Sequence, residues 1–390
     1  MIFTKNFIAI SCINLIVMTA YYLLFVVSSP YAAERFAVSP SLAGLVAGLM
    51  LIGCLIGRFF MGRFIVFAGF KKVLFISITI YSVSLAMYLV ADHLITLMLV
   101  RFIGGVGIGC IGTVTGTLVT YIVPPHLHGR GINYFSLSTI LALAFGPFLG
   151  LVLMRHIPFS QIFLLCSAMG VCCLLIALVL SPPAVAPAET RDDHGFHLDD
   201  YIEYSVIPLS IMVLLFSACY GSVQAFLAFY AEELGLSGTA SWFFLMYAAA
   251  GFCLRPLAGK LLDTRGTNIV IYPALMIAAC GFFLLSHVHS SPALLIAGVL
   301  VGAGVSNLQT AAQTASIRLV SKGRFAAATS TYFIFLDLGI GLGPYLLGFM
   351  VPSVGYQGMF MAATAIVLLS LPVYYWVHGR KQMAIIHRQA

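Results

Sequence analysis

Residues 94–116 read LITLMLVRFIGGVGIGCIGTVTG, a long apolar run that contains a single charged side chain, Arg101. About 20 apolar residues in a helix are enough to cross the hydrocarbon core of a bilayer, so this stretch predicts a membrane-spanning helix. Similar runs recur along the whole chain of 390 residues, which is 61% hydrophobic and only 8% charged. Soluble domains carry about 25% charged residues. The composition therefore excludes a water-soluble globule and predicts an all-α polytopic membrane protein.

Apolar runs bounded by charged residues, proline and glycine predict twelve membrane-spanning helices. An even number of spans places both termini on the same side of the membrane. The predicted spans are 8–28, 42–62, 73–91, 94–116, 132–154, 159–180, 205–229, 240–262, 269–287, 292–316, 325–350 and 356–377.

The basic residues indicate which side is cytoplasmic, because cytoplasmic loops are enriched in Lys and Arg. Of the 19 Lys and Arg residues, 14 lie in the two tails or in the loops on the same side as the tails. Only Arg35 and Arg155 lie in the opposite loops. The sequence therefore predicts a multi-pass protein of the inner or plasma membrane with both termini in the cytoplasm.

The longest polar segment, residues 181–204, contains prolines and a run of acidic residues, and it separates six predicted spans from six. A segment of this composition predicts a solvated linker. The expected organisation is an N-terminal six-helix bundle at 1–180, a cytoplasmic linker at 181–204 and a C-terminal six-helix bundle at 205–390.

The two predicted bundles repeat each other at a constant offset of 197 residues. Arg58 recurs as Arg255, and the dipeptide Gly146-Pro147 recurs as Gly343-Pro344. Repeats separated by six helices are parallel, which is typical of secondary transporters with two pseudo-symmetric bundles and a substrate path between them. The same offset relates Gly62 to Gly259, Gly69 to Gly266, Gly105 to Gly302 and Gly107 to Gly304.

Four short motifs follow one another on the expected spans and loops. They are GRFIVFAGFKK from Gly62, RFIGGVG from Arg101, ALAFGPFLG from Ala142 and GKLLDTRG from Gly259. Together they make the chain resemble the major facilitator superfamily, and within it the twelve-helix drug:proton antiporter group, over essentially its whole length. The first motif has Val66 at the position of the family's loop aspartate. The resemblance implies that this aspartate helps close the cytoplasmic side, so that role is expected to rest on Asp263 alone.

Two charged residues are candidates for proton coupling. Asp337 is the one carboxylate well inside a predicted span, and Arg101 lies roughly 10 Å deep at about 1.5 Å per residue. A charge at mid-membrane costs roughly 2.5–3.5 kcal/mol, so both residues predict a function. Burial favours the protonated form of a carboxylic acid, which would let Asp337 load and release a proton. The resemblance ties the matching arginine to coupling, and a structural role is the alternative for both.

A second group of residues is predicted to act in gating and helix bending. Arg58 and Arg255 lie one turn before the glycines that end their helices, so they either reach the interface or take part in gating. The Gly-Pro dipeptides remove a backbone hydrogen bond and predict bends in the fifth and eleventh spans. The gating set is Arg58, Gly62, Gly69, Arg255, Gly259, Asp263 and Gly266, and the bend set is Gly146, Pro147, Gly343 and Pro344.

Polar uncharged residues at helical spacing predict a face that contacts the substrate. The same side chains also hold membrane helices together, which is the structural alternative for each of them. The candidates are Asn14, Tyr21 and Tyr22 in the first span, Tyr220 and Gln224 in the seventh, and Asn307, Thr310, Gln313 and Thr314 in the tenth.

These features predict a secondary active transporter that moves a small solute by alternating access, with proton-coupled efflux as the first hypothesis. The alternatives are proton-coupled uptake of a nutrient, export of a metabolite such as a metal chelator and, in a different class, a non-transporting membrane receptor. No nucleophile–base pair, metal cluster or ATP-binding G-x-x-x-x-G-K-[ST] loop predicts an enzyme, a cofactor or a bound metal.

The expected partners are a small-molecule substrate, protons and the lipid bilayer. Nucleic acid is excluded because the basic residues are scattered and form no patch. A monomer is expected, because one chain contains a complete two-bundle unit.

Overall fold

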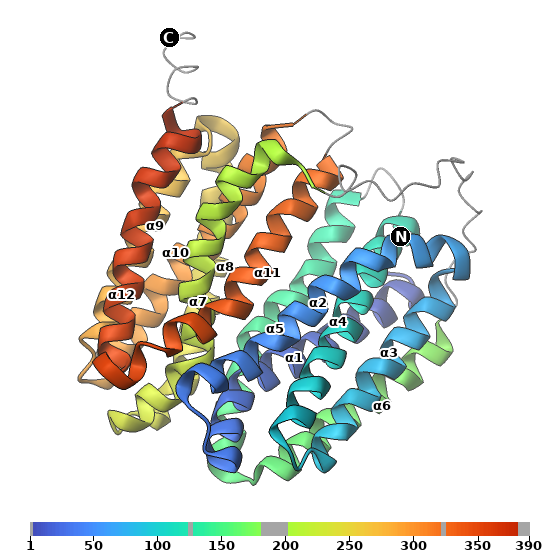
Figure 1. The fold of residues 1–390 in the computed structure, drawn as a ribbon. Coiled ribbons are helices and arrows are strands. Elements are labelled where there is room, and N and C mark those ends of the chain that lie inside the picture. Colours follow the sequence, from blue (N-terminus) through green and yellow to red (C-terminus); the bar gives the residue numbers. More distant parts are fainter. Residues whose placement is uncertain (1–2, 124–127, 181–201, 321–324, 381–390) are drawn as a thin grey trace. The chain divides into compact units, whose positions relative to one another are not determined.

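The computed structural model describes residues 3–123, 128–180, 202–320 and 325–380. These residues form twelve helices that are long and apolar enough to cross a membrane, which confirms the predicted spans (Figure 1). The helices are α1 Lys5–Phe36, α2 Pro40–Ala68, α3 Phe70–Met87, α4 Leu94–Ile122, α5 His128–His156, α6 Phe159–Val179, α7 Ile207–Glu233, α8 Ser237–Arg265, α9 Asn268–Ser286, α10 Ser291–Arg318, α11 Phe325–Gly348 and α12 Val351–Tyr374.

Helix ends differ from the prediction most in α1, by six residues at the ends of α2 and α4, and at the start of α12. Helix α1 continues past residue 28 to Phe36, with Pro30 inside it. Proline is tolerated within membrane helices because neighbouring groups satisfy the freed carbonyls. The helix ends where Ala37 adopts a left-handed conformation with φ 50°. In α12 the backbone leaves helical geometry at Gly355 (φ 67°, ψ 179°), so its regular part begins next to the predicted start at 356.

The chain divides into two compact units. The first comprises Met1–Val38 and Val46–Asp193, and the second comprises Ser39–Leu45 and His194–Ala390. The start of α2 groups with the second unit, where the Ser41 hydroxyl donates to the Tyr345 carbonyl of α11 at 2.8 Å. Residues 181–201 of the predicted linker lie outside the described residues, and a short 3-10 helix, η4 (Tyr204–Val206), leads into α7.

Each unit packs its helices in the same pattern of pairs. In the first unit α1 packs against α5 and α6, and α3 packs against α4 and α6. In the second unit α7 packs against α11 and α12, and α9 packs against α10 and α12. Each pair in the second unit is therefore the counterpart, six helices later, of a pair in the first. The internal repeat predicted from the sequence is confirmed by this packing.

The repeat extends to individual contacts between helices. A Cβ atom on Gly105 of α4 would overlap the backbone of Met50 in α2. A Cβ atom on Gly302 of α10 would overlap the backbone of Tyr247 in α8. Both partners of the second contact lie 197 residues after those of the first. Glycine is required at both positions because the two helix backbones touch there, as is common in membrane helix packing.

At another repeated contact the glycine lies on one helix of the pair in the first unit and on the other helix in the second unit. On α4, a Cβ atom at Gly104 would meet the Ser84 hydroxyl of α3 at 2.7 Å. The same contact in the second unit joins Gly281 of α9 to Val301 of α10, where a Cβ atom at the glycine would lie 2.8 Å from the valine side chain. The glycine is on the later helix in the first unit and on the earlier helix in the second. The contact is kept, although the residues that form it are not.

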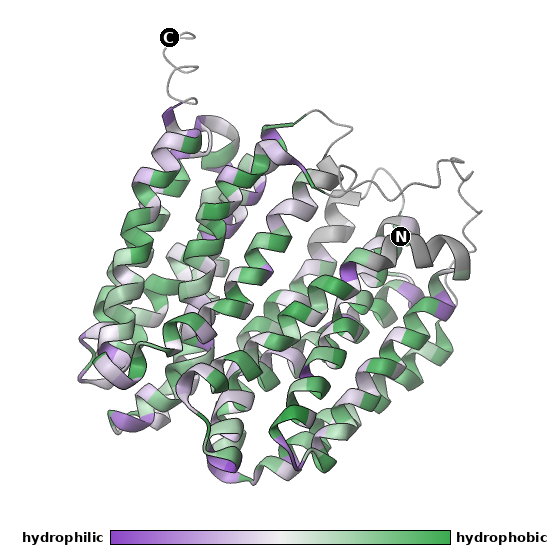
Figure 2. Cartoon of the chain, viewed as in Figure 1, coloured by the Kyte–Doolittle hydropathy of each residue, from purple (hydrophilic) through white to green (hydrophobic). Residues whose placement is uncertain are grey.

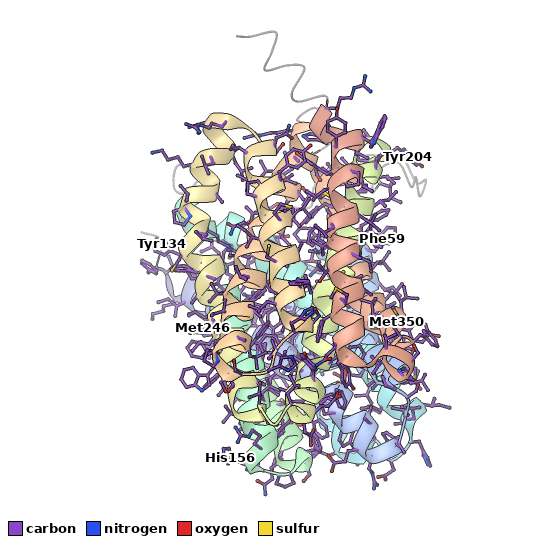
Figure 3. All side chains as sticks on the ribbon, turned by 90° about the vertical axis from the view of Figure 1, so that its left-hand side faces the viewer. Phe59, Tyr134, His156, Tyr204, Met246 and Met350 are labelled. Carbon is purple, nitrogen blue, oxygen red and sulfur yellow. The ribbon has the colours of Figure 1, made fainter. Side chains whose placement is uncertain are left out.

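The outer surface of the helices is apolar. Figure 2 shows hydrophobic residues along the lengths of the helices and hydrophilic residues mainly at the helix ends and in the connections. Large apolar side chains project outward, among them Tyr134, which Figure 3 labels at the edge of its view and which is 44% exposed. Apolar side chains suit the hydrocarbon of a bilayer, and a tyrosine, with its apolar ring and polar hydroxyl, suits the interface between lipid and water. The fold is thus an all-α membrane protein made of two six-helix bundles.

Candidate functional site

Arg101 is fully buried in the first unit, with an exposed fraction of 0%. Its Nε donates to the Val46 carbonyl at 2.9 Å, and one terminal nitrogen donates to the Ala47 carbonyl, both on α2. The other terminal nitrogen lies 3.0 Å from the Met50 sulfur and 3.4 Å from the Tyr88 hydroxyl. Among the described residues, all hydrogen-bond partners of Arg101 are neutral. The guanidinium therefore fastens α4 to α2 while keeping an uncompensated positive charge.

The chemistry of arginine limits what Arg101 can do in proton coupling. A guanidinium does not lose its proton in proteins, so Arg101 cannot itself carry one. Its available roles are to hold α2 in place and to supply a fixed positive charge inside the first unit. The predicted anchor role is supported by these contacts, and a coupling role stays a prediction.

The remaining candidates of the first unit lie on α1. Asn14 is 2% exposed, and its Nδ2 donates to the hydroxyls of Ser138 at 2.7 Å and Thr139 at 2.9 Å on α5. Tyr21 and Tyr22 are in ring contact, with centroids 4.7 Å apart. Asn14 thus ties α1 to α5, which favours the helix-joining alternative for this residue.

In the second unit Tyr220 and Gln224, which lie four positions apart on α7, form a buried pair. The Gln224 Nε2 donates to the Tyr220 hydroxyl at 2.9 Å, and both side chains are at most 3% exposed. The Tyr220 ring stacks on Tyr247 of α8, with centroids 5.1 Å apart and an interplanar angle of 13°. Tyr247 was not predicted, because its partner is on another helix and no sequence spacing links the two. The three residues form an aromatic and polar cluster between α7 and α8.

The α10 candidates occupy one side of their helix. Asn307 is 5% exposed, while Thr310, Gln313 and Thr314 are half-buried. The hydroxyls of Thr310 and Thr314 donate to carbonyls one turn earlier in α10, at 3.2 and 2.9 Å. The Tyr332 hydroxyl of α11 donates to the Gln309 carbonyl at 2.9 Å, which joins α11 to α10.

Asp337 is buried on α11, with 6% of its surface exposed. Among the carboxylates whose side chains the structure describes, it is the one placed far from a helix end, about 18 Å from Phe325 at about 1.5 Å per residue. Helix α11 packs most closely on α7, where a Cβ atom at Gly343 would overlap the Ala218 backbone. Asp337 is therefore buried midway along α11, and its role in coupling stays a prediction.

The helix-bend candidates lie in close contacts. Helices α5 and α11 continue through Pro147 and Pro344. A Cβ atom at Gly146 would meet the Tyr22 side chain at 2.6 Å, so this glycine, like Gly343, lets two helices approach each other. Bending at these positions stays a prediction.

Two of the gating candidates have a backbone reason to be glycine. Gly69 separates α2 from α3 with φ 75° and ψ 156°, and Gly266 follows α8 with φ 85° and ψ −177°. This region of backbone conformation is essentially restricted to glycine. The two positions correspond under the 197-residue offset, so the repeat preserves the geometry of this turn.

The other gating candidates are less constrained. Arg255 is exposed and Arg58 is half-buried. A Cβ atom at Gly259 would have open space around it. The side chain of Asp263 and the surroundings of Gly62 lie outside what the structure describes.

A polar cluster at one end of α9 and α12 was not predicted. The Tyr374 hydroxyl donates to Asn268 Oδ1 at 2.6 Å, and Asn268 Nδ2 donates to the Gly379 carbonyl at 3.0 Å. The Thr267 hydroxyl lies 3.2 Å from the His378 Nε2. Tyr375–Gly379 form a π-helical turn, η6, that brings the chain into this cluster. No spacing in the sequence signals it, because its members lie more than 100 residues apart.

The described residues contain no group of three or more His, Cys, Asp or Glu side chains placed to hold a metal ion. In the described part of the chain, the buried polar groups of the two units are instead distributed along membrane-spanning helices. The arrangement combines a fixed cation in one unit with a buried carboxylate and a polar helix face in the other.

Comparison with known proteins agrees with this architecture. The family model of the Major Facilitator Superfamily matches residues 10–297 and 274–389. The chain therefore belongs to the Major Facilitator Superfamily. It is a transporter of the secondary type, and members of this family are not enzymes.

Similar proteins include two bacterial relatives and a solved structure. "Uncharacterized MFS-type transporter YhhS" of Escherichia coli O6:H1 is 27% identical over 372 residues, covering 91% of this chain and 88% of the relative. "Multidrug resistance protein MdtG" of Salmonella typhi is 22% identical over 355 residues, covering 88% and 87%. A bacterial homologue of the human lysosomal transporter Spinster, in an inward-facing and occupied conformation, shares the fold with a TM-score of 0.77, 15% identity and coverage of 95% and 96%.

Proposed function

We propose that this transporter exports a small solute across the cytoplasmic membrane in exchange for protons, by alternating access. The observation that carries the proposal is Asp337, a carboxylate that is 6% exposed about 18 Å along a membrane-spanning helix. A carboxylate at this depth of a membrane helix is costly, and such residues commonly mark a proton or ion pathway. Asp337 would bind a proton from one side of the membrane and release it to the other.

The residues around the two units take supporting roles in this proposal. Arg101 supplies a fixed charge and holds α2, while Gly69 and Gly266 preserve the turns that gate the cytoplasmic side together with Arg58, Gly62, Arg255, Gly259 and Asp263. The solute would contact polar residues of α1, α7 and α10. Both termini would lie in the cytoplasm, and one chain would suffice for transport.

Efflux is favoured over uptake by the antiporter-like motifs and by the similarity to a protein named for multidrug resistance. Uptake of a nutrient together with protons uses the same parts in the opposite direction, and it remains the second candidate. If the solute and the proton bind in turn, the protein exchanges one for the other. If they bind together, it carries both in the same direction.

The test begins with a growth screen of a deletion strain against toxic compounds, which identifies solutes that the protein removes. An identified solute is then followed in inverted membrane vesicles acidified inside. We expect accumulation that collapses when a protonophore is added. Protonophore-sensitive uptake into intact cells would instead support the symporter.

Replacing Asp337 by Asn should abolish proton-coupled movement of the solute, because a side-chain amide does not bind and release a proton at physiological pH. The matched control is Asp92→Asn, which removes a carboxylate that is 76% exposed and paired with Arg35 at 3.4 Å. The control variant should transport like the wild type. Full activity of the Asp337→Asn variant would remove Asp337 from the coupling mechanism.

A further inference from the structure

We propose that Asn307 of α10 accepts a hydrogen bond from the transported solute, so that the second unit selects solutes carrying N–H donors, protonated amines above all. The inference rests on the proposed export function and adds a substrate class to it. It starts from a buried oxygen atom that the fold leaves unused.

The Asn307 side chain has one satisfied end and one unsatisfied end. Its Nδ2 donates to the Ala303 carbonyl at 2.7 Å, one turn earlier in α10. Its Oδ1 is buried and has no hydrogen-bond partner among the described residues. Turning the amide over would point its oxygen at the Ala303 carbonyl oxygen, which is repulsive. The free end of the side chain is therefore a hydrogen-bond acceptor.

An unsatisfied acceptor at this depth needs an explanation. Leaving a buried polar group without a partner disfavours the folded state substantially. Most such groups in native proteins have a protein or water partner, and exceptions often mark a functional position. Leucine or alanine would have filled this position without the cost. The residue is thus explained if a ligand completes its hydrogen bonding during transport.

Asn307 lies on its helix between the residues of α10 that contact α8 and those that contact α9. Gly302 and Ser306 face α8, and Gly304 faces α9, where a Cβ atom would lie 2.5 Å from the Ala278 backbone nitrogen. At about 100° per residue, Asn307 lies roughly 140° around the helix from Gly302 and 60° from Gly304, between the directions of Ser306 and Gly304.

Thr310 and Thr314 share this side of α10 with Asn307, because residues three and seven positions apart lie within about 60° of each other. Both threonines are half-buried and so more exposed than Asn307.

Asn307, Thr310 and Thr314 present acceptors. The Thr310 hydroxyl donates to the Ser306 carbonyl and the Thr314 hydroxyl donates to the Thr310 carbonyl, so both protons are committed within α10. A hydroxyl oxygen keeps its acceptor lone pairs when it donates. Asn307 Oδ1 and the two hydroxyl oxygens can therefore only accept hydrogen bonds. A solute group that has donors and no acceptors complements this face best, and an ammonium group is of that kind.

Asp337 adds a negative charge at a similar depth on a helix that contacts α10. Helix α11 packs against α10. Counting from the adjacent ends of the two helices, Asn307 is about 16 Å from Arg318 and Asp337 is about 18 Å from Phe325. A carboxylate at this depth favours a cation over a neutral solute whenever it is ionised. Charge and hydrogen-bonding pattern therefore both favour a protonated amine.

The test compares matched pairs of cations in inverted vesicles. Each pair is a primary ammonium compound and its N-trimethyl counterpart, beginning with phenylethylammonium and phenylethyltrimethylammonium. The two members carry the same charge, and only the first has N–H donors. We expect the wild type to move the donor-bearing member with a kcat/KM about tenfold higher, which corresponds to one hydrogen bond.

The variant Asn307→Leu should bring the two members to within about twofold of each other. The control is Ser316→Ala, on the same helix, which removes a fully buried hydroxyl that donates to the Ala312 carbonyl. This control should keep the tenfold preference. The proposal is overturned if the wild type moves both members equally, or if Asn307→Leu keeps the preference.

A thermal unfolding measurement on the solute-free protein separates binding from structure. Asn307→Leu should unfold at the same temperature as the wild type or higher, because it removes an unsatisfied buried oxygen. A fall of several degrees, more than the loss of the Nδ2 bond to the Ala303 carbonyl accounts for, would overturn the proposal. Failure of the export function is distinguishable, because then no compound from the growth screen would move in a protonophore-sensitive way. Failure of the inference alone would leave that movement intact.

Discussion

A buried guanidinium held by backbone carbonyls, as Arg101 is, combines a positional and an electrostatic role. The N–H groups of the guanidinium donate to two successive carbonyls of α2, at Val46 and Ala47. The guanidinium also contacts Met50 and Tyr88. Its charge lies over the Phe25 ring, 6.0 Å from the centroid, which is a favourable cation–π distance. One side chain thus joins four elements of the first unit.

Replacing Arg101 by Lys should destabilise the first unit. An ammonium has three donors on a point charge and cannot span the same acceptors, so at least one buried partner loses its bond. We expect a loss of about 1–3 kcal/mol. The midpoint of denaturant unfolding in detergent measures it. Arg35→Lys, at an exposed ion pair, serves as the control and should change stability by less than about 1 kcal/mol. Equal midpoints for Arg101→Lys and the wild type would contradict the anchor role.

At the scale of residues, the sequence predicts which charges are deep but not what they touch. The depth of Arg101 and Asp337 follows from counting along an apolar run. The acceptors of Arg101 are backbone carbonyls, which every residue carries, so no residue type marks them. The unsatisfied oxygen of Asn307 is equally invisible, because the side chain that would pair with it could come from any helix.

The helix contacts are conserved between the two units as pairs. At the α3–α4 contact a serine faces a glycine, Ser84 and Gly104, and at the corresponding α9–α10 contact a glycine faces a valine, Gly281 and Val301. In each case one side must be small because the helices are close. The combined volume at the contact is therefore the constrained quantity, and the identity of the small partner is not.

This leads to a prediction for the α3–α4 contact. Gly104→Val alone should destabilise the protein by about 1–3 kcal/mol, because the new side chain meets the Ser84 hydroxyl. The double variant Ser84→Gly, Gly104→Val recreates the pair found at Gly281 and Val301, and it should recover most of the loss. A double-mutant cycle by thermal unfolding gives the coupling energy. Additive effects of the two substitutions would contradict the idea of an exchangeable pair.

At the scale of elements, the sequence predicts where helices lie better than where they end. All twelve spans were predicted, because each requires a long apolar run. The continuation of α1 past Pro30 was not predicted. In soluble proteins a proline commonly marks the end of a helix, whereas it is tolerated inside a membrane helix. The π-helical turn at Tyr375–Gly379 has no signature in the sequence, since the contacts that stabilise it come from α9.

The whole molecule is predicted to have both termini in the cytoplasm, because the basic residues concentrate in the loops on that side. A green fluorescent protein fused after residue 390 should fluoresce, and alkaline phosphatase fused at the same point should be inactive. Fusions to the loop between α1 and α2, which contains no basic residue after Arg35, should give the reverse. Active phosphatase at the C-terminus would contradict the predicted orientation.

At this scale the repeat is the most informative feature of the sequence. A constant offset of 197 residues predicted two equivalent bundles, and the helix pairs within each unit confirm them. The grouping of Ser39–Leu45 with the second unit was not predicted, because it follows from contacts of α2 with α11 such as Ser41 with Tyr345.

The single residue Gly69 that joins α2 to α3 has a mechanical consequence. A connection this short has no slack to absorb a displacement of one helix, so a tilt or slide of α2 at this end must be passed on to α3. The corresponding junction between α8 and α9 is only two residues long, Gly266 and Thr267. At each junction the two helices are therefore mechanically coupled. A displacement of the first helix during a transport cycle also displaces the second.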